Sequence, residues 1–195
     1  MRLDDLGKTI FIILLFVFAV WSATLWPPSE TNDIKPVIDG VILEEEYPDV
    51  RALSGMKLYV YNDEEYAYIG LSSAGLGWVA VGFLPVDVHK GADFLFGAVV
   101  EGETMVSDQY GLEQYRHEPD TFLGGTSDIL EFDGSENSGT FIEFKIKMNS
   151  GDPYDVLLEC GKSYSIILAY SETVDDFQTK HSMRLHHTIK LLCFN

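Results

Sequence analysis

From residue 36 onward, short runs of β-branched, aromatic and other apolar residues alternate with clusters of Gly, Pro, Asn, Asp and Ser. No part of this stretch shows the sustained 3.6-residue hydrophobic period of an amphipathic helix. Apolar runs bounded by turn residues are typical of β-strands. The pattern predicts strands at residues 56–61, 65–72, 78–83, 93–100, 104–110, 128–132, 140–148 and 163–170, followed by a last strand at residues 181–191.

The apolar patterns also indicate how deeply the strands are buried. Residues 78–83 and 93–100 are almost continuously apolar, as expected of central strands buried on both faces. Residues 141–148 alternate instead, so that one face is expected to lie in the core and the other in water. Regular short strands and turns without helices predict an all-β domain, a two-sheet antiparallel β-sandwich.

The beginning of the chain follows a different pattern. Residues 9–26 form an 18-residue stretch without a charge, and such a helix would reach roughly 27 Å, enough to cross a bilayer core. A cleaved signal peptide is the alternative. We favour a retained N-terminal hydrophobic helix, because the run is long for a signal core and Trp21 and Trp26 resemble interfacial anchors.

This interpretation divides the chain into three parts. Residues 1–26 are the predicted membrane anchor or signal segment, residues 27–35 a polar linker, and residues 36–195 one β-sandwich domain. A retained anchor makes the protein a single-pass protein of the cell membrane with its domain on the extracytoplasmic side. A cleaved segment makes the domain a secreted one.

The domain carries all of the net charge, because the charges before residue 27 cancel. The formal net charge is −18, from 31 acidic and 13 basic residues. Such a surface repels phosphate backbones and disfavours nucleic acid as a partner. It fits cationic partners, metal ions or a high-salt habitat, or it serves solubility alone.

Several aspartates near the predicted turns could bind a hard cation such as calcium. They lack the dense ligand spacing of a known calcium-binding loop, so they are predicted to be solvated turn carboxylates. These residues are Asp87, Asp93, Asp108, Asp120 and Asp128.

The two cysteines, Cys160 and Cys193, flank the last two predicted strands. A disulfide between them would pin the C-terminal strand, and two free buried thiols are the alternative. The sequence contains no Cys-x-x-Cys-His, no zinc knuckle, no Gly-rich phosphate loop and no Gly-x-Ser-x-Gly elbow. No catalytic constellation is found, so the domain is predicted not to be an enzyme.

The histidines differ in their expected surroundings. If residues 181–191 form one unbroken strand, His181 and His187 share its apolar face and His186 points to water. An imidazole on an apolar face needs a partner, which a backbone carbonyl can supply. His117 lies in a polar stretch and is expected to be solvated.

Two neighbouring motifs resemble a known family. Residues 77–83 form a Gly-Trp-x-x-x-Gly-Phe motif, and after a loop residues 91–93 read Gly-Ala-Asp. This order is similar to the pattern of the DOMON domain family. The resemblance extends over roughly residues 36–191, through three further segments: Ile38-Asp39-Gly40, Glu45-Glu46-Tyr47, and a block from Gly161 through Ile166-Ile167-Leu168-Ala169-Tyr170 to His181.

The resemblance implies a DOMON-like β-sandwich that binds haem b or sugars. In the cytochrome members, a methionine two residues before Gly-Ala-Asp and a late histidine clamp the haem iron. The matching positions here are His89 and His181. His89 in place of methionine implies either a bis-histidine haem, which suits iron, or a lost site with His89 as an ordinary loop residue.

The prediction from the sequence is therefore a membrane-tethered, extracytoplasmic b-type cytochrome domain that binds haem b non-covalently. It would pass single electrons to a redox partner protein that the sequence does not name. The alternative is a haem-free DOMON-like module that binds a carbohydrate or another ligand. In that module Trp78 could stack on a sugar, although its apolar neighbours predict that it is buried.

Overall fold

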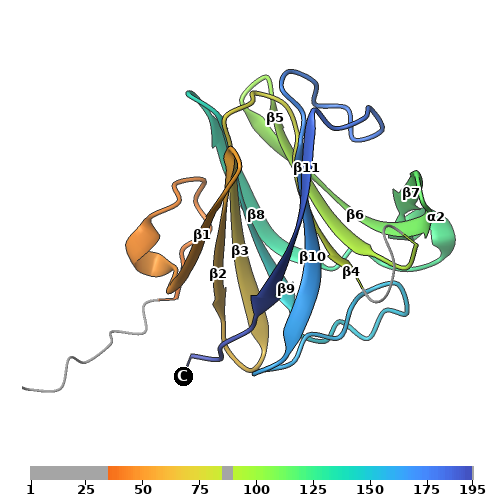
Figure 1. The fold of residues 1–195 in the computed structure, drawn as a ribbon. Helices are drawn as coiled ribbons and strands as arrows, with labels where there is room; N and C mark the ends of the chain where they lie inside the picture. The colour runs from red at the N-terminus through yellow and green to blue at the C-terminus, as the bar shows by residue number, and fades with distance from the viewer. Residues whose placement is uncertain (1–34, 85–89, 195) are drawn as a thin grey trace, which may run out of the picture. The chain divides into compact units, whose positions relative to one another are not determined.

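The computed structural model describes residues 35–84 and 90–194 (Figure 1). The predicted N-terminal helix within residues 1–26 and the candidate ligand His89 lie outside these residues. Within the described part of the chain, no helix is long and apolar enough to span a membrane.

Eleven strands make up almost all of the regular structure of the described residues. The other regular elements are a 3₁₀ turn, η1 (Glu44–Glu46), which precedes the first strand, and one short helix, α2 (Asp120–Leu123). The strands are β1 (Asp49–Leu53), β2 (Met56–Asn62), β3 (Tyr66–Ser73), β4 (Val79–Leu84), β5 (Asp93–Val100), β6 (Glu103–Glu113), β7 (Arg116–Pro119), β8 (Ile129–Glu136), β9 (Thr140–Lys147), β10 (Ser163–Tyr170) and β11 (Met183–Lys190).

The strands form two antiparallel sheets that face each other, which confirms the predicted all-β sandwich (Figure 1). One sheet has the order β1-β2-β3-β9-β8, and the other has the order β11-β10-β4-β5-β6-β7. The main core lies between them. Leu71, Ile142 and Phe144 from the first sheet are fully buried there against Val79 and Val81 from the second. Each such side chain contributes about 1.5–3 kcal/mol by leaving water.

The last strand starts later than the sequence predicts. Strand β11 begins at Met183, which pairs with Tyr170 at the end of β10. His181 precedes β11 because the partner strand has already ended, so no ladder is available to it. From Met183 onward the predicted alternation holds, with Ile189 in the core and Arg184 exposed. The sequence pattern also missed β1, β7 and α2.

A buried carboxylate holds the segment that precedes β1 in place through hydrogen bonds. Glu143 on β9 is fully buried and accepts hydrogen bonds from the Tyr47 hydroxyl at 2.7 Å, from Gly40 N–H at 3.0 Å and from Asp39 N–H at 3.3 Å. Burial raises the pKa of Glu143, and the three donors oppose that rise. Gly40 has a φ of +78°, and a Cβ there would lie 3.0 Å from the Gly134 backbone. These contacts account for the motif at residues 38–47.

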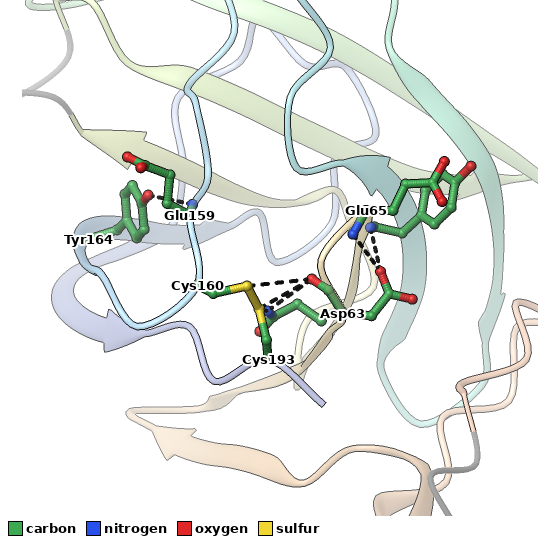
Figure 2. Close-up of a disulfide and its surroundings, with 8 residues drawn as sticks. Asp63, Glu65, Glu159, Cys160, Tyr164 and Cys193 are labelled. Atoms are coloured by element: carbon green, nitrogen blue, oxygen red, sulfur yellow. Dashed lines mark hydrogen bonds between the residues drawn. A yellow bond between two sulfur atoms is a disulfide. The ribbon is translucent and has the colours of Figure 1, made fainter. Parts of the chain in front are cut away.

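A disulfide joins Cys160, just before β10, to Cys193, just after β11, with a Cα–Cα distance of 5.4 Å (Figure 2). The C-terminal end is also tied to β2, because Phe194 N–H donates to the Asn62 carbonyl at 2.9 Å. In the chain-entropy model, closing a loop with a sequence separation of 33 residues contributes about 3–4 kcal/mol.

Candidate functional site

A cavity of about 610 Å³ lies on the face of the six-stranded sheet that is turned away from the sandwich core. Its floor comes from alternate residues of three neighbouring strands, whose other residues point into the core. The lining residues are Trp78, Ala80, Phe94, Phe96, Tyr115, His117, Ile167, Ala169, Gln178, Thr179, Lys180, His181 and Arg184.

The floor of the cavity is apolar and aromatic. Phe96 lies edge-on to Trp78 at a centroid distance of 5.3 Å and is tilted against Phe94 at 5.9 Å. Ala80 and Ala169 have small side chains, which leaves a hollow between the aromatic rings and the segment before β11. Trp78 is only 3% exposed, as predicted, and its buried Nε1–H has no acceptor within the described residues.

The two glycines of the Gly-Trp-x-x-x-Gly-Phe motif permit close packing around the cavity. A Cβ at Gly82 would lie 2.3 Å from the Phe94 ring, so only glycine lets that ring lie over β4. A Cβ at Gly77 would lie 2.5 Å from the backbone of Val174. Gly77 therefore lets the connection between β10 and β11 pack directly against the start of β4.

The connection between β10 and β11, residues 171–182, brings His181 to the cavity. Backbone hydrogen bonds join it to the motif: Gly77 N–H donates to Ser171 O at 3.2 Å and Trp78 N–H to Val174 O at 3.0 Å. Phe177 then packs on Phe96 at 5.5 Å. A chain held at these points presents residues 178–181 to the opening of the cavity.

His181 is half-buried and lines the cavity, as does Arg184, the second residue of β11. Burial lowers the pKa of the His181 imidazole, and the positive charges of Arg184 and Lys180 lower it further. A neutral imidazole keeps the lone pair that a metal requires. His181 therefore has the chemistry of a metal or haem ligand.

The prediction that His117 is solvated is wrong. The residue lies on β7, half-buried, and its ring stacks on Phe96 at 5.0 Å with an interplanar angle of 26°. The sequence suggested a solvated loop because most of residues 115–120 are polar. In the strand, however, Gly111 pairs with His117 and Gln109 with Pro119, which places His117 beside the cavity.

A buried glutamine orients the His117 ring. Gln109 is 2% exposed; its Nε2 donates to Ser107 Oγ at 2.9 Å, and its Oε1 lies 2.5 Å from His117 Nδ1. The amide oxygen accepts from Nδ1–H, so the lone pair remains on Nε2. Burial lowers the pKa of His117, against the opposing charge of Glu118. Metal-binding histidines are commonly held in this way by a hydrogen bond to the second ring nitrogen.

The structure thus brings His181 and His117 to one cavity. His186 is exposed on β11, and His187 is half-buried on the opposite face of that strand; neither lines the cavity. Of the aspartates predicted to be solvated, Asp93, Asp108 and Asp120 are buried, Asp128 is half-buried, and Asp87 lies outside the described residues. The side chains of Asp93 and Asp108 point to the inner side of the sheet, away from the cavity.

Comparison with known proteins agrees with this architecture. The family model of the DOMON domain matches residues 53–171. No curated protein sequence matches the chain. The structure is similar to the cytochrome b domain of pyranose dehydrogenase from Coprinopsis cinerea, with a TM-score of 0.52 and 13% sequence identity over 69% of this chain and 75% of that chain.

A second solved structure, the cytochrome domain of Myriococcum thermophilum cellobiose dehydrogenase, has a TM-score of 0.45 and 12% identity over 76% of this chain and 80% of that one. The first likeness supports the β-sandwich fold. The family match covers more than half of the chain and includes the motif that shapes the cavity. The chain belongs to the DOMON domain family.

Proposed function

We propose that the cavity binds haem b and that the domain is a b-type cytochrome module that passes single electrons. The observation that carries the proposal is a half-buried imidazole, His181, at the edge of an aromatic cavity, where burial lowers its pKa. The similar solved structures are themselves described as cytochrome domains. Haem would supply the one-electron chemistry, and the protein would supply binding, orientation and electrostatics.

The residues present fit haem b in size and polarity. The volume of about 610 Å³ lies in the range of small-molecule and cofactor sites, which are mostly apolar with a few placed polar groups. Trp78, Phe94, Phe96 and Ile167 would contact the flat porphyrin ring. The buried Trp78 Nε1–H would gain an acceptor from a bound group that carries one.

Two cations stand at the same opening. Lys180 and Arg184 line the cavity in a chain whose net charge is −18. Ammonium and guanidinium groups pair well with carboxylates, so they suit the two propionates of haem b. The segment that presents His181 would thus also hold the acidic edge of the cofactor.

We propose that His181 and His89 would hold the haem iron. His181 is placed at the cavity, whereas His89 remains a prediction from the family pattern because it lies outside the described residues. His117 is an alternative to His89, since its Nε2 keeps a lone pair and its ring is oriented by Gln109. Either pair would hold the iron through two imidazoles and leave no open site for a substrate, which would favour electron transfer.

The proposed location is the extracytoplasmic side of the cell membrane, with the anchor within residues 1–26. The disulfide between Cys160 and Cys193 supports an oxidising compartment, where such bonds persist. The partner that donates or accepts electrons would be a second redox protein. Without haem, the same aromatic cavity would serve a binding module for another flat or partly apolar ligand.

Titration of the haem-free, full-length protein with hemin tests the proposal. Hemin absorbs where tryptophan emits, so binding next to Trp78 should quench emission and saturate at one hemin per chain. A Trp78→Phe variant should still bind hemin, as followed by the Soret change, with a smaller loss of emission because only Trp21 and Trp26 remain. Quenching that rises without saturation, or is equal in both proteins, would place hemin outside the cavity.

A further inference from the structure

Five aspartates from separate parts of the chain form two overlapping groups that share Asp155. Asp93 begins β5, and Asp108 on β6 pairs with the core residue Leu95, two positions along from Asp93. Both therefore point inward, away from the haem cavity. Asp120 begins α2, and Asp152 and Asp155 lie between β9 and β10. Carboxylate oxygens of Asp93, Asp108 and Asp155 lie within 4.8 Å of one another, as do those of Asp120, Asp152 and Asp155.

Most of these carboxylates are buried and lack partners. Asp93 and Asp108 are 5% exposed and Asp120 is 1% exposed. The Oδ1 atoms of Asp93, Asp108 and Asp155, and both carboxylate oxygens of Asp120, are buried without a donor in the described part of the chain. Asp120 and Asp155 can form a hydrogen bond with each other only when one of them carries a proton. A buried carboxylate oxygen without a partner is costly, so this arrangement calls for a group that the protein itself does not supply.

Backbone donors hold the other carboxylate oxygens in place. Asp93 Oδ2 accepts from Val156 N–H at 3.0 Å, and Asp108 Oδ2 accepts from Asp128 N–H at 2.8 Å. Asp152 accepts from Thr126 N–H at 2.6 Å and from Tyr154 N–H at 2.8 Å. These bonds orient the carboxylates and leave Oδ1 of Asp93 and of Asp108 unpartnered within the cluster.

Positive charge is scarce around the cluster. Among the described residues, no Lys or Arg forms an ion pair with these aspartates, and the nearby Lys147 is exposed. Burial, and then the neighbouring carboxylates, raise the pKa of Asp108 to about 7 and that of Asp120 to about 8. The bare cluster would therefore retain protons near neutral pH, unless a cation replaces them.

We propose that these two groups of carboxylates, which share Asp155, bind calcium and so join β5, β6, α2 and the segment before β10. Every ligand is a carboxylate oxygen, which suits a hard cation and not zinc or copper. Calcium accepts a cage of several protein carboxylates, whereas magnesium keeps its waters and usually takes one or two. Within each group the oxygens lie within 4.8 Å of one another, which is within the span of about 4.6–5.2 Å that two oxygens on one calcium ion can have.

The site would fasten the sheet from the side opposite to the cavity. Asp93 immediately precedes Phe94, which lines the cavity, so one strand carries both sites. Tyr154, beside Asp155, donates its hydroxyl to the Leu123 carbonyl at 2.9 Å and packs on Tyr110 at 5.1 Å. These contacts bring α2 and the segment before β10 together at the cluster. Calcium would then stabilise the fold whether or not haem is bound.

Calorimetry and thermal unfolding of the full-length protein test the site. After EDTA treatment and dialysis, calcium chloride should bind saturably and raise the unfolding midpoint by roughly 5–10 °C at a concentration about 100-fold above the dissociation constant. Magnesium chloride should shift the midpoint much less. The absence of both a binding heat and a shift with calcium would mean that protons alone neutralise the cluster. An equal shift with magnesium would overturn the assignment to calcium.

Asn substitutions separate the site from general electrostatics. Asp93→Asn and Asp120→Asn should weaken calcium binding at least tenfold, yet leave the midpoint in EDTA unchanged or higher because like charges are removed. Asp49→Asn, on β1 of the other sheet, removes one charge and should keep the full calcium response. Full calcium responses in both site variants would overturn the proposal. If a variant does not fold, terbium binding to the wild-type protein tests the site instead. Terbium luminescence excited through tyrosine should appear on binding and should be lost when calcium displaces the terbium; its absence would overturn the proposal.

Discussion

His181→Ala is expected to lower the haem content of the purified full-length chain at least about tenfold, since even the supporting residues of a metal ligand contribute 10–100-fold to affinity. The reason is geometric and electrostatic. His181 lies at the cavity, held there through the hydrogen bonds of residues 171–182 with Gly77 and Trp78. Its lowered pKa keeps the lone pair available at neutral pH. Haem per chain, from haem absorbance and protein concentration, is the measurement.

His187→Ala is the matched control for this prediction. His187 is also half-buried but lies on the opposite face of β11 from Arg184, away from the cavity. The His187→Ala variant should have the same haem content as the wild-type protein. Equal haem contents in the two variants would show that His181 does not bind the haem. The same assay on His89→Ala and His117→Ala identifies the second ligand, whose loss should give a high-spin spectrum.

Ala169→Trp is expected to exclude haem by filling the cavity, to below about one tenth of the wild-type content, because cofactor sites are largely pre-formed hollows. Ala169 lies on the cavity side of β10, between Leu168 and Tyr170 of the core cluster. A large side chain there would occupy the space above the aromatic floor without entering the main core. Haem content and the thermal unfolding midpoint should be measured together.

The matched control is Ala52→Trp, because Ala52 is exposed on β1 in the other sheet. This variant should bind haem like the wild type, and both variants should unfold cooperatively. A fully haem-loaded Ala169→Trp protein would show that haem binds elsewhere. An Ala169→Trp protein that fails to fold can be replaced by Ala169→Phe, which fills less volume at the same position.

The apolar pattern predicted most of the fold. A strand buried on one face has alternating apolar residues, and a strand buried on both faces has a continuous apolar run. The runs at residues 78–83 and 93–100 correspond to β4 and β5, which lie side by side within the six-stranded sheet. The prediction failed where neighbours far along the chain decide the structure. His181 precedes β11 only because β10 ends at Tyr170, and residues 181–182 show no sign of that boundary.

The candidate site could be predicted only in part for the same reason. The spacing of the family motif drew attention to His181 and Trp78, and both line the cavity. His117 was missed because its surroundings, Phe96 and Gln109, become its neighbours only through the pairing of β5, β6 and β7. Asp93, Asp108 and Asp120 were considered as calcium ligands but were predicted to be solvated, since the members of the cluster are scattered from residue 93 to residue 155 and lack the spacing of a calcium-binding loop. One sequence signal could have indicated that His117 is partly buried. It lies between the charged residues Arg116 and Glu118, and in a strand its side chain would point to the opposite face from theirs.

The absorption spectrum of the full-length protein, purified from a host with ample haem, tests the central claim most directly. The proposed site predicts a Soret band at one haem per chain, with a low-spin spectrum in both oxidation states because two histidines would hold the iron. Protein that is folded, with its cavity residues intact, and that shows no Soret band would contradict the claim.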